Sequence, residues 1–527
     1  MNSKIYLAKN IKLDKNYKAV LNYSESDMLS LITDQNNLVY TESNAQFIRD
    51  TKSIIVKGKY NVCIQANYMA FSNPDYSNKW FFAFIDEVIY KGENNTEIKY
   101  TIDIFSTWYD YWTPKACFVV REHVLSDEYG EHTIPENLET GEYITGYSVD
   151  FDDIGESHVV MATTISPFDG TTAVTGGVYG GIYSGVKYYV FQQITDLNNA
   201  LNIIAANGNS DSIVSLFYCP DWITGYDSAT FTDGIAVVPQ TTGVTKESGI
   251  SIPLTPNVID DYTPKNKKLF TYPYVGYLVS NNSGNNMLYR LEDFYRDSET
   301  TTGSFDLYGT CTSGGSIRLI PKYYKVKDTT FNLTNNNEYG LTAGKYPVAS
   351  WGNDSYTNWL TEQGVNIGGL KLDAYQFNLL KGFLSFSPGK ILGAVQENYK
   401  HEFNPIESTG NINSGDVTYS MDKLTYSGYF LTIKKEYAII IDKFFSRMGY
   451  KVNSIKIPNM SNRQNYNYVQ VANEENVAYP NNYNNICLPA IALNEINNLF
   501  RNGITIWNNH ANFGDYSVSN DIVTPTP

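Results

Sequence analysis

The sequence predicts a mainly β protein of several domains, with one α+β module inserted among the strands. Three observations support this fold class. Aromatic residues are abundant, with Tyr 44, Phe 25 and Trp 7 against only 18 % charged residues, and aromatic side chains favour strands. Several segments alternate apolar and polar residues with the period of two that a half-buried strand requires. The 527 residues exceed the roughly 250 to 300 at which one core stops growing.

The first 125 residues predict mainly strands. We expect them at 53–57, 62–66, 80–90, 97–105 and 117–124, where apolar or aromatic runs are bounded by turn-forming residues. The turn residues at 73–75 and 91–95 predict loops between neighbouring antiparallel strands. The acidic, proline-bearing stretch 126–147 predicts a linker or an excursion from the sheet.

A mixture of strands and helices predicts the α+β module within 126–265. We expect strands at 159–165 and 188–191 and a second, shorter helix at 211–216. The first helix is expected at 196–206, where the apolar residues recur on one helical face: Leu197, Ala200, Leu201, Ile203 and Ile204.

Strands resume after this module, and two helices are expected near the C-terminus. The strands are predicted at 275–279, 287–291, 303–308, 317–321 and 427–435. The helices are predicted at 438–448, ending at Gly449, and at 495–501, ending before Gly503, because glycine commonly follows the last helical residue. The predicted parts are therefore an N-terminal β domain at 1–125, the α+β module at 126–265, a second β-rich segment at 266–350, an apolar insertion at 351–425 and a C-terminal β/α segment at 426–527.

Charge and cysteine content restrict the function. With 39 basic and 55 acidic residues the formal net charge is −16, which argues against a protein that grips nucleic acid through its phosphates. The five cysteines are Cys63, Cys117, Cys219, Cys311 and Cys487. No two of them form a CxxC pair, so we expect reduced core residues without zinc. The first 14 residues have no continuous apolar region typical of a secretory signal, so assembly in the cytoplasm is expected.

The patterns that could carry chemistry are weak, so the sequence predicts no enzyme and no cofactor. The glycine-rich stretch 176–181 lacks a phosphate-loop lysine and predicts a turn or hairpin loop. His401-Glu402 lacks the second histidine of a zinc motif. Asp75 and Asp103 can be imagined as a glycosidase pair, but nothing singles them out.

Two further charged clusters have ordinary structural interpretations. The acidic residues Asp150, Asp152, Asp153 and Glu156 could accept a divalent cation, although an exposed turn is favoured because the spacing differs from that of an EF-hand. The triplet Arg121-Glu122-His123 suits a buried or interfacial ion pair better than a catalytic dyad, since no nucleophile accompanies it.

A glycine-rich segment, 365–395, is the best candidate for contact with a membrane or another apolar surface. Lysines and an aspartate interrupt it, so an uninterrupted membrane-spanning run of roughly 18 apolar residues is absent. It predicts an amphipathic or loop segment that needs an apolar partner, with a packed helix hairpin as the alternative. Its candidate contact residues are Ile367, Leu370, Leu372, Phe377, Leu380, Phe383, Leu384, Phe386, Ile391 and Leu392.

Five dense aromatic or basic motifs, spread over the chain, carry a resemblance to a known family. They are 71–84 (FSNPDYSNKWFFAF), 102–108 (IDIFSTW), 118–124 (FVVREHV), 444–453 (FFSRMGYKVN, followed by NYVQ at 467–470) and 502–507 (NGITIW, followed by NFGDYSV at 512–518). In identity and order they resemble the tail-knob, or distal tail tube, proteins of phi29-like short-tailed bacteriophages.

The resemblance implies a structural virion protein at the tail tip. It implies a homo-hexamer with a β-walled tube, joined to lower collar and tail tube proteins, through which double-stranded DNA is ejected without specific binding. The segment 365–395 lies where the family carries an apolar loop that plugs the tube and meets the host membrane during entry. Here that segment is shorter and more polar, which favours the plug over the membrane role.

A receptor-binding or glycan-degrading tail protein is the alternative function, because such proteins are also rich in tyrosine and strands. They are commonly trimers with repeats along a β-helix, and this sequence has no internal period. An acidic lumen would repel the phosphate backbone and let a duplex slide, so the net charge agrees with a conduit.

Overall fold

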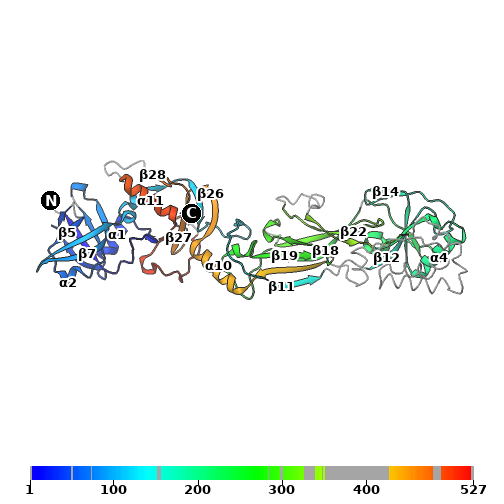
Figure 1. The fold of residues 1–527 in the computed structure, drawn as a ribbon, viewed down its shortest axis with the longest axis horizontal. Helices are drawn as coiled ribbons and strands as arrows, with labels where there is room; N and C mark the ends of the chain where they lie inside the picture. The colour runs from blue at the N-terminus through cyan, green and yellow to red at the C-terminus, as the bar shows by residue number, and fades with distance from the viewer. Residues whose placement is uncertain are drawn as a thin grey trace, which may run out of the picture. The chain divides into compact units, whose positions relative to one another are not determined.

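The computed structural model describes residues 3–48, 52–72, 74–150, 156–241, 243–282, 284–296, 301–325, 339–346, 348–350, 426–478 and 488–523. The chain divides into two compact units, and each is described by itself. Unit 1 consists of Met1–Glu139, Pro264–Leu269 and Glu436–Pro527. Unit 2 consists of Thr140–Thr263 and Phe270–Lys435. Both are built mainly from strands (Figure 1).

Unit 1 begins with a seven-stranded sheet in the order β3-β1-β6-β7-β8-β5-β4. Its strands are β1 (Lys4–Ala8), β3 (Leu38–Glu42), β4 (Gln46–Ile48), β5 (Ser53–Val56), β6 (Tyr68–Ser72), β7 (Trp80–Gly92) and β8 (Asn95–Ile102). The outermost strands β3 and β4 are consecutive and only three residues, 43–45, join them, so the sheet must curl strongly. The curl encloses an apolar core that includes Ile5, Val56, Met69 and Ile98.

A five-stranded sheet with the order β2-β29-β27-β10-β26 completes unit 1. Its strands are β2 (Ala19–Leu21), β10 (Cys117–Glu122), β26 (Tyr450–Lys456), β27 (Tyr466–Val471) and β29 (Ile504–Trp507). Helices α3 (Ile104–Trp108) and α11 (Ala490–Asn502) pack on one face, where Trp112, Val469 and Phe500 share a core. Two short strands, β9 (Thr113–Pro114) and β28 (Val477–Ala478), pair beside them.

The other helices of unit 1 are α1 (Glu25–Thr33), α2 (Tyr60–Cys63) and α10 (Lys435–Met448). Ser24 begins α1 with a capping box, in which its hydroxyl accepts from the N–H of Asp27 at 3.2 Å. Met28 and Ile32 of α1 then pack with Phe82 and Trp507 in a second core. Helix α10 ends, as expected, before Gly449, whose φ of 65° is the left-handed conformation that glycine adopts freely.

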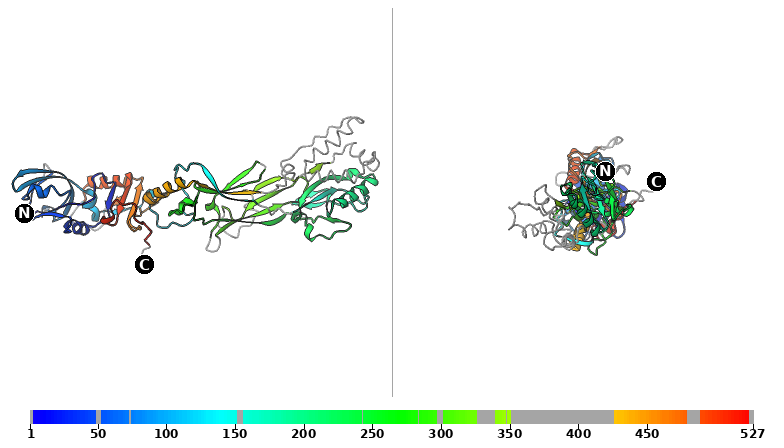
Figure 2. Two further views of the ribbon diagram at one scale, coloured as in Figure 1. Left: turned by 90° about the horizontal axis from the view of Figure 1, so that it is seen from below. Right: turned by 90° about the vertical axis from the view of Figure 1, so that its right-hand side faces the viewer.

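Unit 2 contains two four-stranded sheets that pack face to face. One has the order β11-β25-β19-β20 and the other β18-β21-β22-β23. Their strands are β11 (Tyr143–Asp150), β18 (Val244–Pro253), β19 (Val275–Ser280), β20 (Asn286–Tyr289), β21 (Thr302–Gly309), β22 (Ser316–Pro321), β23 (Leu341–Lys345) and β25 (Ser427–Ile433). The ring centres of Tyr289 and Phe305 lie 5.1 Å apart between the two sheets. Figure 1 labels β18, β19 and β22 among these strands, and Figure 2 shows the ribbon in two further views.

A five-stranded sheet, β17-β15-β12-β16-β24, and helix α4 form an α+β part of unit 2. Its elements are β12 (Ser157–Thr163), β15 (Lys187–Phe191), α4 (Ile194–Ala206), β16 (Ile213–Pro220), β17 (Ile235–Val237) and β24 (Val348–Ser350). Leu197, Ala200, Leu201 and Ile204 of α4 pack on this sheet, which confirms the helical face read from the sequence at these positions. Ile203, expected on the same face, is exposed. The short helix α5 (Asp221–Thr224) follows β16 directly.

Two of the predicted elements are wrong. Residues 62–66 were expected as a strand, but Tyr60–Cys63 form the short helix α2, which leaves Val62 and Ile64 exposed while Cys63 is buried. Residues 211–216 were expected as a helix, but Ile213–Pro220 form β16, a central strand between β12 and β24. Short apolar runs have no period that separates a buried strand from a helix, and pairing with β12 decided the second case.

Two predicted boundaries also change. The strand expected at 97–105 ends at Ile102, because Asp103 begins α3 by accepting a hydrogen bond from the N–H of Ser106 at 3.1 Å. The stretch 126–147, predicted as a linker or an excursion from the sheet, ends in strand β11, which pairs with β25. None of the helices in the described part of the chain combines the length and apolar character that crossing a lipid bilayer demands.

Candidate functional site: a buried polar network in unit 1

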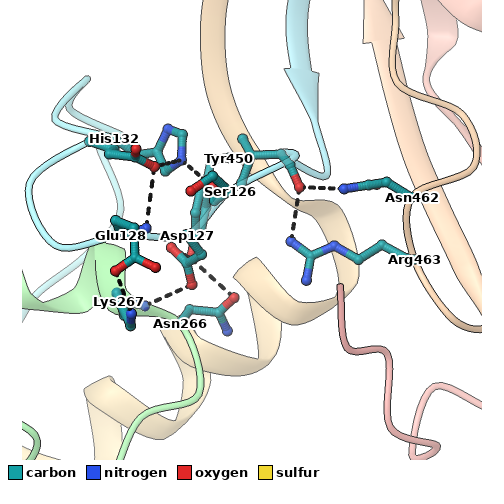
Figure 3. A network of polar contacts seen from close by, with 11 residues as sticks. Ser126, Asp127, Glu128, His132, Asn266, Lys267, Tyr450, Asn462 and Arg463 are labelled. Carbon is teal, nitrogen blue, oxygen red and sulfur yellow. Dashed lines mark hydrogen bonds and ion pairs between the residues drawn. The ribbon is translucent and has the colours of Figure 1, made fainter. Parts of the chain in front are cut away.

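A buried polar network joins chain segments of unit 1 that are far apart in sequence. We define it by the side chains of Arg121, Asp127, Glu136, Asn266, Lys268, Asp442 and Tyr450. These residues come from the end of β10, the stretch 126–136, the segment Pro264–Leu269, helix α10 and the start of β26. The motifs 118–124 and 444–453 therefore meet here. Figure 3 shows the part around Asp127 and Tyr450.

Glu136 is the charged centre of this network. Its carboxylate has no exposed surface, and it pairs with the guanidinium of Arg121 and with the ammonium of Lys268 at 2.5 Å. The N–H of Lys451 donates to the same carboxylate at 2.8 Å. Burial lowers the pKa of Lys268, while Glu136 opposes that shift. A carboxylate shared between two cations is costly to disrupt, because removal of one partner leaves a buried charge unpaired.

Aromatic rings cover the two cations of the network. The guanidinium of Arg121 lies 4.8 Å from the centre of the Phe444 ring. The ammonium of Lys268 lies 5.2 Å from the centre of the Tyr450 ring. Such cation–π contacts stabilise a charge that is withdrawn from water. Aromatic residues of the motif 444–453 thus contact both cations.

Asp442 on α10 holds the segment Pro264–Leu269 through main-chain groups. Its carboxylate accepts from the N–H groups of Lys265 and Asn266, each at 3.0 Å, and from the Asn266 side-chain amide at 2.8 Å. The same amide donates to the hydroxyl of Ser446 at 2.8 Å. A carboxylate that accepts several hydrogen bonds fixes the conformation of a loop that contributes little apolar surface of its own.

Asp127 forms a second attachment for this segment. It accepts from the N–H of Lys267 at 3.1 Å and from the hydroxyl of Tyr450 at 2.9 Å. Burial raises the pKa of the Asp127 carboxyl, and these two donors oppose the shift. Burial, together with Asp127, also raises the pKa of Tyr450 well above its ordinary value. Nearby, at the surface, the ammonium of Lys267 lies 2.9 Å from the carboxylate of Glu128 (Figure 3).

Glu122 and His123 flank the network on the five-stranded sheet. Glu122 is fully buried, pairs with Lys456 and accepts from the N–H of Asn459 at 2.8 Å. The buried ion pair expected from Arg121-Glu122-His123 is therefore confirmed, with partners outside the triplet. His123 accepts from the N–H of Tyr468 at 2.7 Å through Nδ1. Burial lowers its pKa to about 3, with a smaller effect from Arg463, so the ring is neutral at pH 7.

The motifs 71–84 and 102–108 meet elsewhere in unit 1, around the buried Lys79. Its ammonium donates to the carbonyl of Thr107 at 2.8 Å and lies 3.8 Å from the centre of the Tyr111 ring and 4.6 Å from that of Trp108. Glu25 lies 3.6 Å away. Burial lowers the pKa of Lys79 to about 8. The lysine of this aromatic motif is therefore enclosed within the fold rather than displayed to a ligand.

The remaining candidates from the sequence do not gather into a reactive site. Residues 176–181 form the hairpin of β13 (Gly177–Tyr179) and β14 (Ile182–Ser184), which confirms the predicted loop. Asp103 is buried and accepts from the hydroxyl of Tyr68 at 2.6 Å, a structural role. Within the part of the chain that the structure describes, no three His, Cys, Asp or Glu side chains are placed to bind a metal.

Several sequence candidates lie outside the described residues. They include Asp152, Asp153, His401-Glu402, Cys487 and the whole segment 365–395 with its ten apolar contact residues, and the side chain of Asp75 is also outside the description. The ends of the acidic cluster are described: Asp150 accepts from the hydroxyl of Ser427 at 2.7 Å, and the carbonyl of Glu156 accepts from the N–H of Asp221 at 3.0 Å.

Sequence reasoning missed Asp127, Glu136 and Asp442. The first two lie in the stretch expected to be a linker, and the third was treated only as part of a helix. Acidic residues in an exposed linker and acidic residues that anchor a buried segment look alike in sequence. Lys268 was the one signal in the sequence that pointed to these carboxylates. It lies beside aromatic residues, and a buried lysine needs a carboxylate partner.

Packed sheets and a buried network that holds distant chain segments together are typical of a structural protein, and the comparisons give its class as that of phage tail-knob proteins. The tail knob protein gp12 of bacteriophage C1 has the same fold, with a TM-score of 0.63 over 99 % of this chain and 100 % of that chain at 13 % identity. Residues 238–521 match the family described as the C-terminal domain of the Bacillus phage phi29 tail knob protein gp9. The chain belongs to this family.

Further comparisons extend the similarity over nearly the whole chain. Residues 1–113 match the N-terminal family of caudoviral major tail proteins. The tail knob protein gp9 of Bacillus phage PZA is 25 % identical over 92 % of each chain. Tail knob gp9 of Bacillus phage phi29 is 23 % identical over 92 % of each, and that of Bacillus phage B103 is 21 % identical over 97 % of each. The chain is a structural component of a phage tail knob.

Proposed function

We propose that this tail knob protein closes into a ring of six copies and forms a plugged conduit through which double-stranded DNA leaves the virion. The proposal includes attachment to lower collar or tail tube proteins, contact with the host membrane during entry, and assembly in the host cytoplasm before the virion is complete. It treats the chain as a structural protein with no catalytic step. The five-part division of the chain, with β domains at 1–125 and 266–350, is part of the same proposal.

The proposed ring rests on one observation, the two long edge strands of unit 2. Strand β11 stands at the end of one four-stranded sheet and β18 at the end of the other, so each pairs on one side only among the described strands. No residue of β11 is buried, and in β18 only Ser248 and Ile252 are. Edge strands expose unpaired main-chain groups, and proteins normally pair or protect them. A closed ring can cover two different edges of each copy in one repeated interface.

The net charge of −16 supports a conduit that does not hold its cargo. Binding of DNA requires cations that replace the counterions of the phosphates. A surface with an excess of carboxylates instead repels the duplex and leaves it free to slide. The wall of the proposed tube therefore needs to be stiff and closed. Sheets that are shared between neighbouring copies would meet both requirements.

The segment 365–395 supplies the proposed plug. Its apolar residues from six copies would meet at the distal end of the tube and keep the channel shut, since each copy alone needs an apolar partner. Contact with the cell envelope would offer another apolar environment and shift the segment outward. The candidate residues are those ten defined in the sequence, from Ile367 to Leu392.

Electron microscopy of the purified full-length protein tests this proposal. Class averages of end views should show sixfold rings with density at the centre. Rings without sixfold symmetry would reject the proposed stoichiometry. Trimers or monomers would remove the geometric basis of the conduit and favour the receptor-binding or glycan-degrading alternative, which glycan binding and hydrolysis assays would then examine.

A further inference from the structure

Two of the four described cysteines lie against one another in unit 2. Cys219 is the next-to-last residue of β16, and Cys311 follows the end of β21 by two residues. Both are buried, with exposed fractions of 0 % and 6 %. Their side chains are in hydrogen-bonding contact, and both are free thiols. Cys63 and Cys117, the other described cysteines, are buried in separate cores of unit 1.

Independent packing contacts bring the same two chain segments together. A Cβ atom at Gly309 would lie 2.3 Å from the side chain of Ile223, so the end of β21 touches α5, the helix directly after Cys219. The hydroxyl of Tyr346 hydrogen-bonds to Cys219, and the N–H of Tyr346 donates to the carbonyl of Gly315 at 2.8 Å, in the turn after Cys311. The two thiols therefore face one another in a region that is fixed from both sides.

We propose that Cys219 and Cys311 are a latent disulfide pair that closes when the protein meets a small-molecule disulfide outside the reducing cytoplasm. The thiolate of one cysteine attacks the disulfide RSSR, forms a mixed disulfide and releases RS⁻, which takes up the proton of the attacking thiol. The second cysteine, deprotonated in turn, attacks the mixed disulfide and releases the second RSH. The net change oxidises two protein thiols to one bond and reduces RSSR to two RSH.

The bond would add a covalent cross-link between two sheets of unit 2. Cys219 belongs to the five-stranded sheet with α4, and Cys311 follows a strand of the sheet with β18. Burial raises the pKa of the Cys219 thiol, so its reactive thiolate form is scarce and the reaction is slow. A phage tail passes from a reducing cytoplasm to an oxidising medium. A disulfide that forms slowly after release would therefore stabilise the finished particle. The pairing does not depend on the proposed ring.

Disulfide mapping of the full-length protein tests the pairing. The reduced protein is incubated at mildly alkaline pH with oxidised glutathione, alkylated, digested and analysed by mass spectrometry. We expect one linked peptide that joins Cys219 to Cys311, and a fall of two in the five titratable thiols of the denatured chain. The Cys117→Ser variant should still lose two thiols, whereas Cys219→Ser should form no linked peptide and lose at most one thiol, as a mixed disulfide of glutathione with Cys311.

Three results would overturn the pairing without any variant having to fold. The first is wild-type protein that keeps five titratable thiols after gentle warming with oxidised glutathione has allowed unit 2 to open locally. The second is protein that carries glutathione on either cysteine but no Cys219–Cys311 peptide. The third is a linked peptide that involves Cys63, Cys117 or Cys487 in their place.

Discussion

The guanidinium of Arg121 donates to the carbonyl of Gly449 at 2.7 Å, across 328 residues of sequence. The same guanidinium pairs with Glu136, and Glu136 pairs with Lys268. One end of helix α10 is thereby tied to strand β10 and to the segment Pro264–Leu269. Because both neighbours of that segment in sequence belong to unit 2, the network fixes inside unit 1 a piece of chain that has little apolar surface to hold it.

Substitution Glu136→Gln should destabilise unit 1 by about 3 to 5 kcal/mol, because it leaves two buried cations without their shared carboxylate. Urea denaturation followed by circular dichroism measures the change. The matched control is Glu87→Gln, which breaks the 2.8 Å pair with Lys99, where both side chains are about half exposed. We expect a much smaller loss for the control, since solvent screens that pair. Equal losses in the two variants would show that the network contributes no more than a surface ion pair.

Substitution Gly449→Ala should destabilise unit 1 by about 2 to 5 kcal/mol through strain and overlap together. The residue has a φ of 65°, and a Cβ there would lie 2.1 Å from the carbonyl oxygen of Glu122. Gly514→Ala is the control, because its φ is 81° but no atom lies within 4 Å of its Cβ position. Left-handed strain alone predicts about 1 to 2 kcal/mol for the control. A Gly449→Ala protein no less stable than the control would contradict the close approach.

The neutral His123 should contribute to loss of stability in acid. Its pKa of about 3 in the folded chain lies below the ordinary 6.5. Between these values the unfolded chain binds a proton that the folded chain does not, so stability falls as the pH falls from about 6.5 to about 3. The free energy of unfolding of His123→Gln, measured over this range, should fall less steeply than that of the wild type, by up to about 1.4 kcal/mol per pH unit. Parallel curves would exclude a buried neutral His123.

The edge of β11 should tolerate charge in the single chain but not in the assembled ring. Thr145 and Ser148 are exposed, so Thr145→Lys with Ser148→Lys should change the unfolding free energy by within about 0.5 kcal/mol per site. Lysine on an edge strand opposes strand pairing between chains. Light scattering should show assembly shifted to at least about tenfold higher protein concentration, equivalent to about 1.4 kcal/mol. Thr195→Lys on α4 is the control, and unchanged assembly of the β11 variant would remove this edge from the interface.

Replacement of 365–395 by a short Gly-Ser linker should leave ring assembly intact and open the channel. The reason is that the proposed ring interface lies on strands, whereas the segment only fills the lumen. End-view class averages of the variant should lose central density and keep the ring. A second variant keeps the full length of the segment and changes only its ten apolar residues to Ser. Comparison of the two variants separates the effect of lost bulk from that of lost apolar contact. Loss of the ring itself would show that the segment belongs to the wall.

The sequence by itself determined those features that depend on neighbouring residues. Helix α10 ends at Gly449 and α11 before Gly503, and the glycines at 180 and 181 turn the hairpin of β13 and β14, because each needs only a local left-handed conformation. The helical face of α4 and the alternating strand β25 follow from periods of 3.6 and two residues. The five motifs likewise fixed the family, since their residues and order are properties of the chain alone.

Only the tertiary structure decided which strands the short apolar runs join and which charges are buried. Residues 213–220 became β16 because β12 and β24 lie on either side of it, and α2 formed at 60–63 because one helical turn buries Cys63. Asp127, Glu136 and Asp442 gained their roles from partners more than 100 residues away. Burial raises the electrostatic cost of a charge and so selects its partner, and burial depends on segments that meet only when the whole chain has folded.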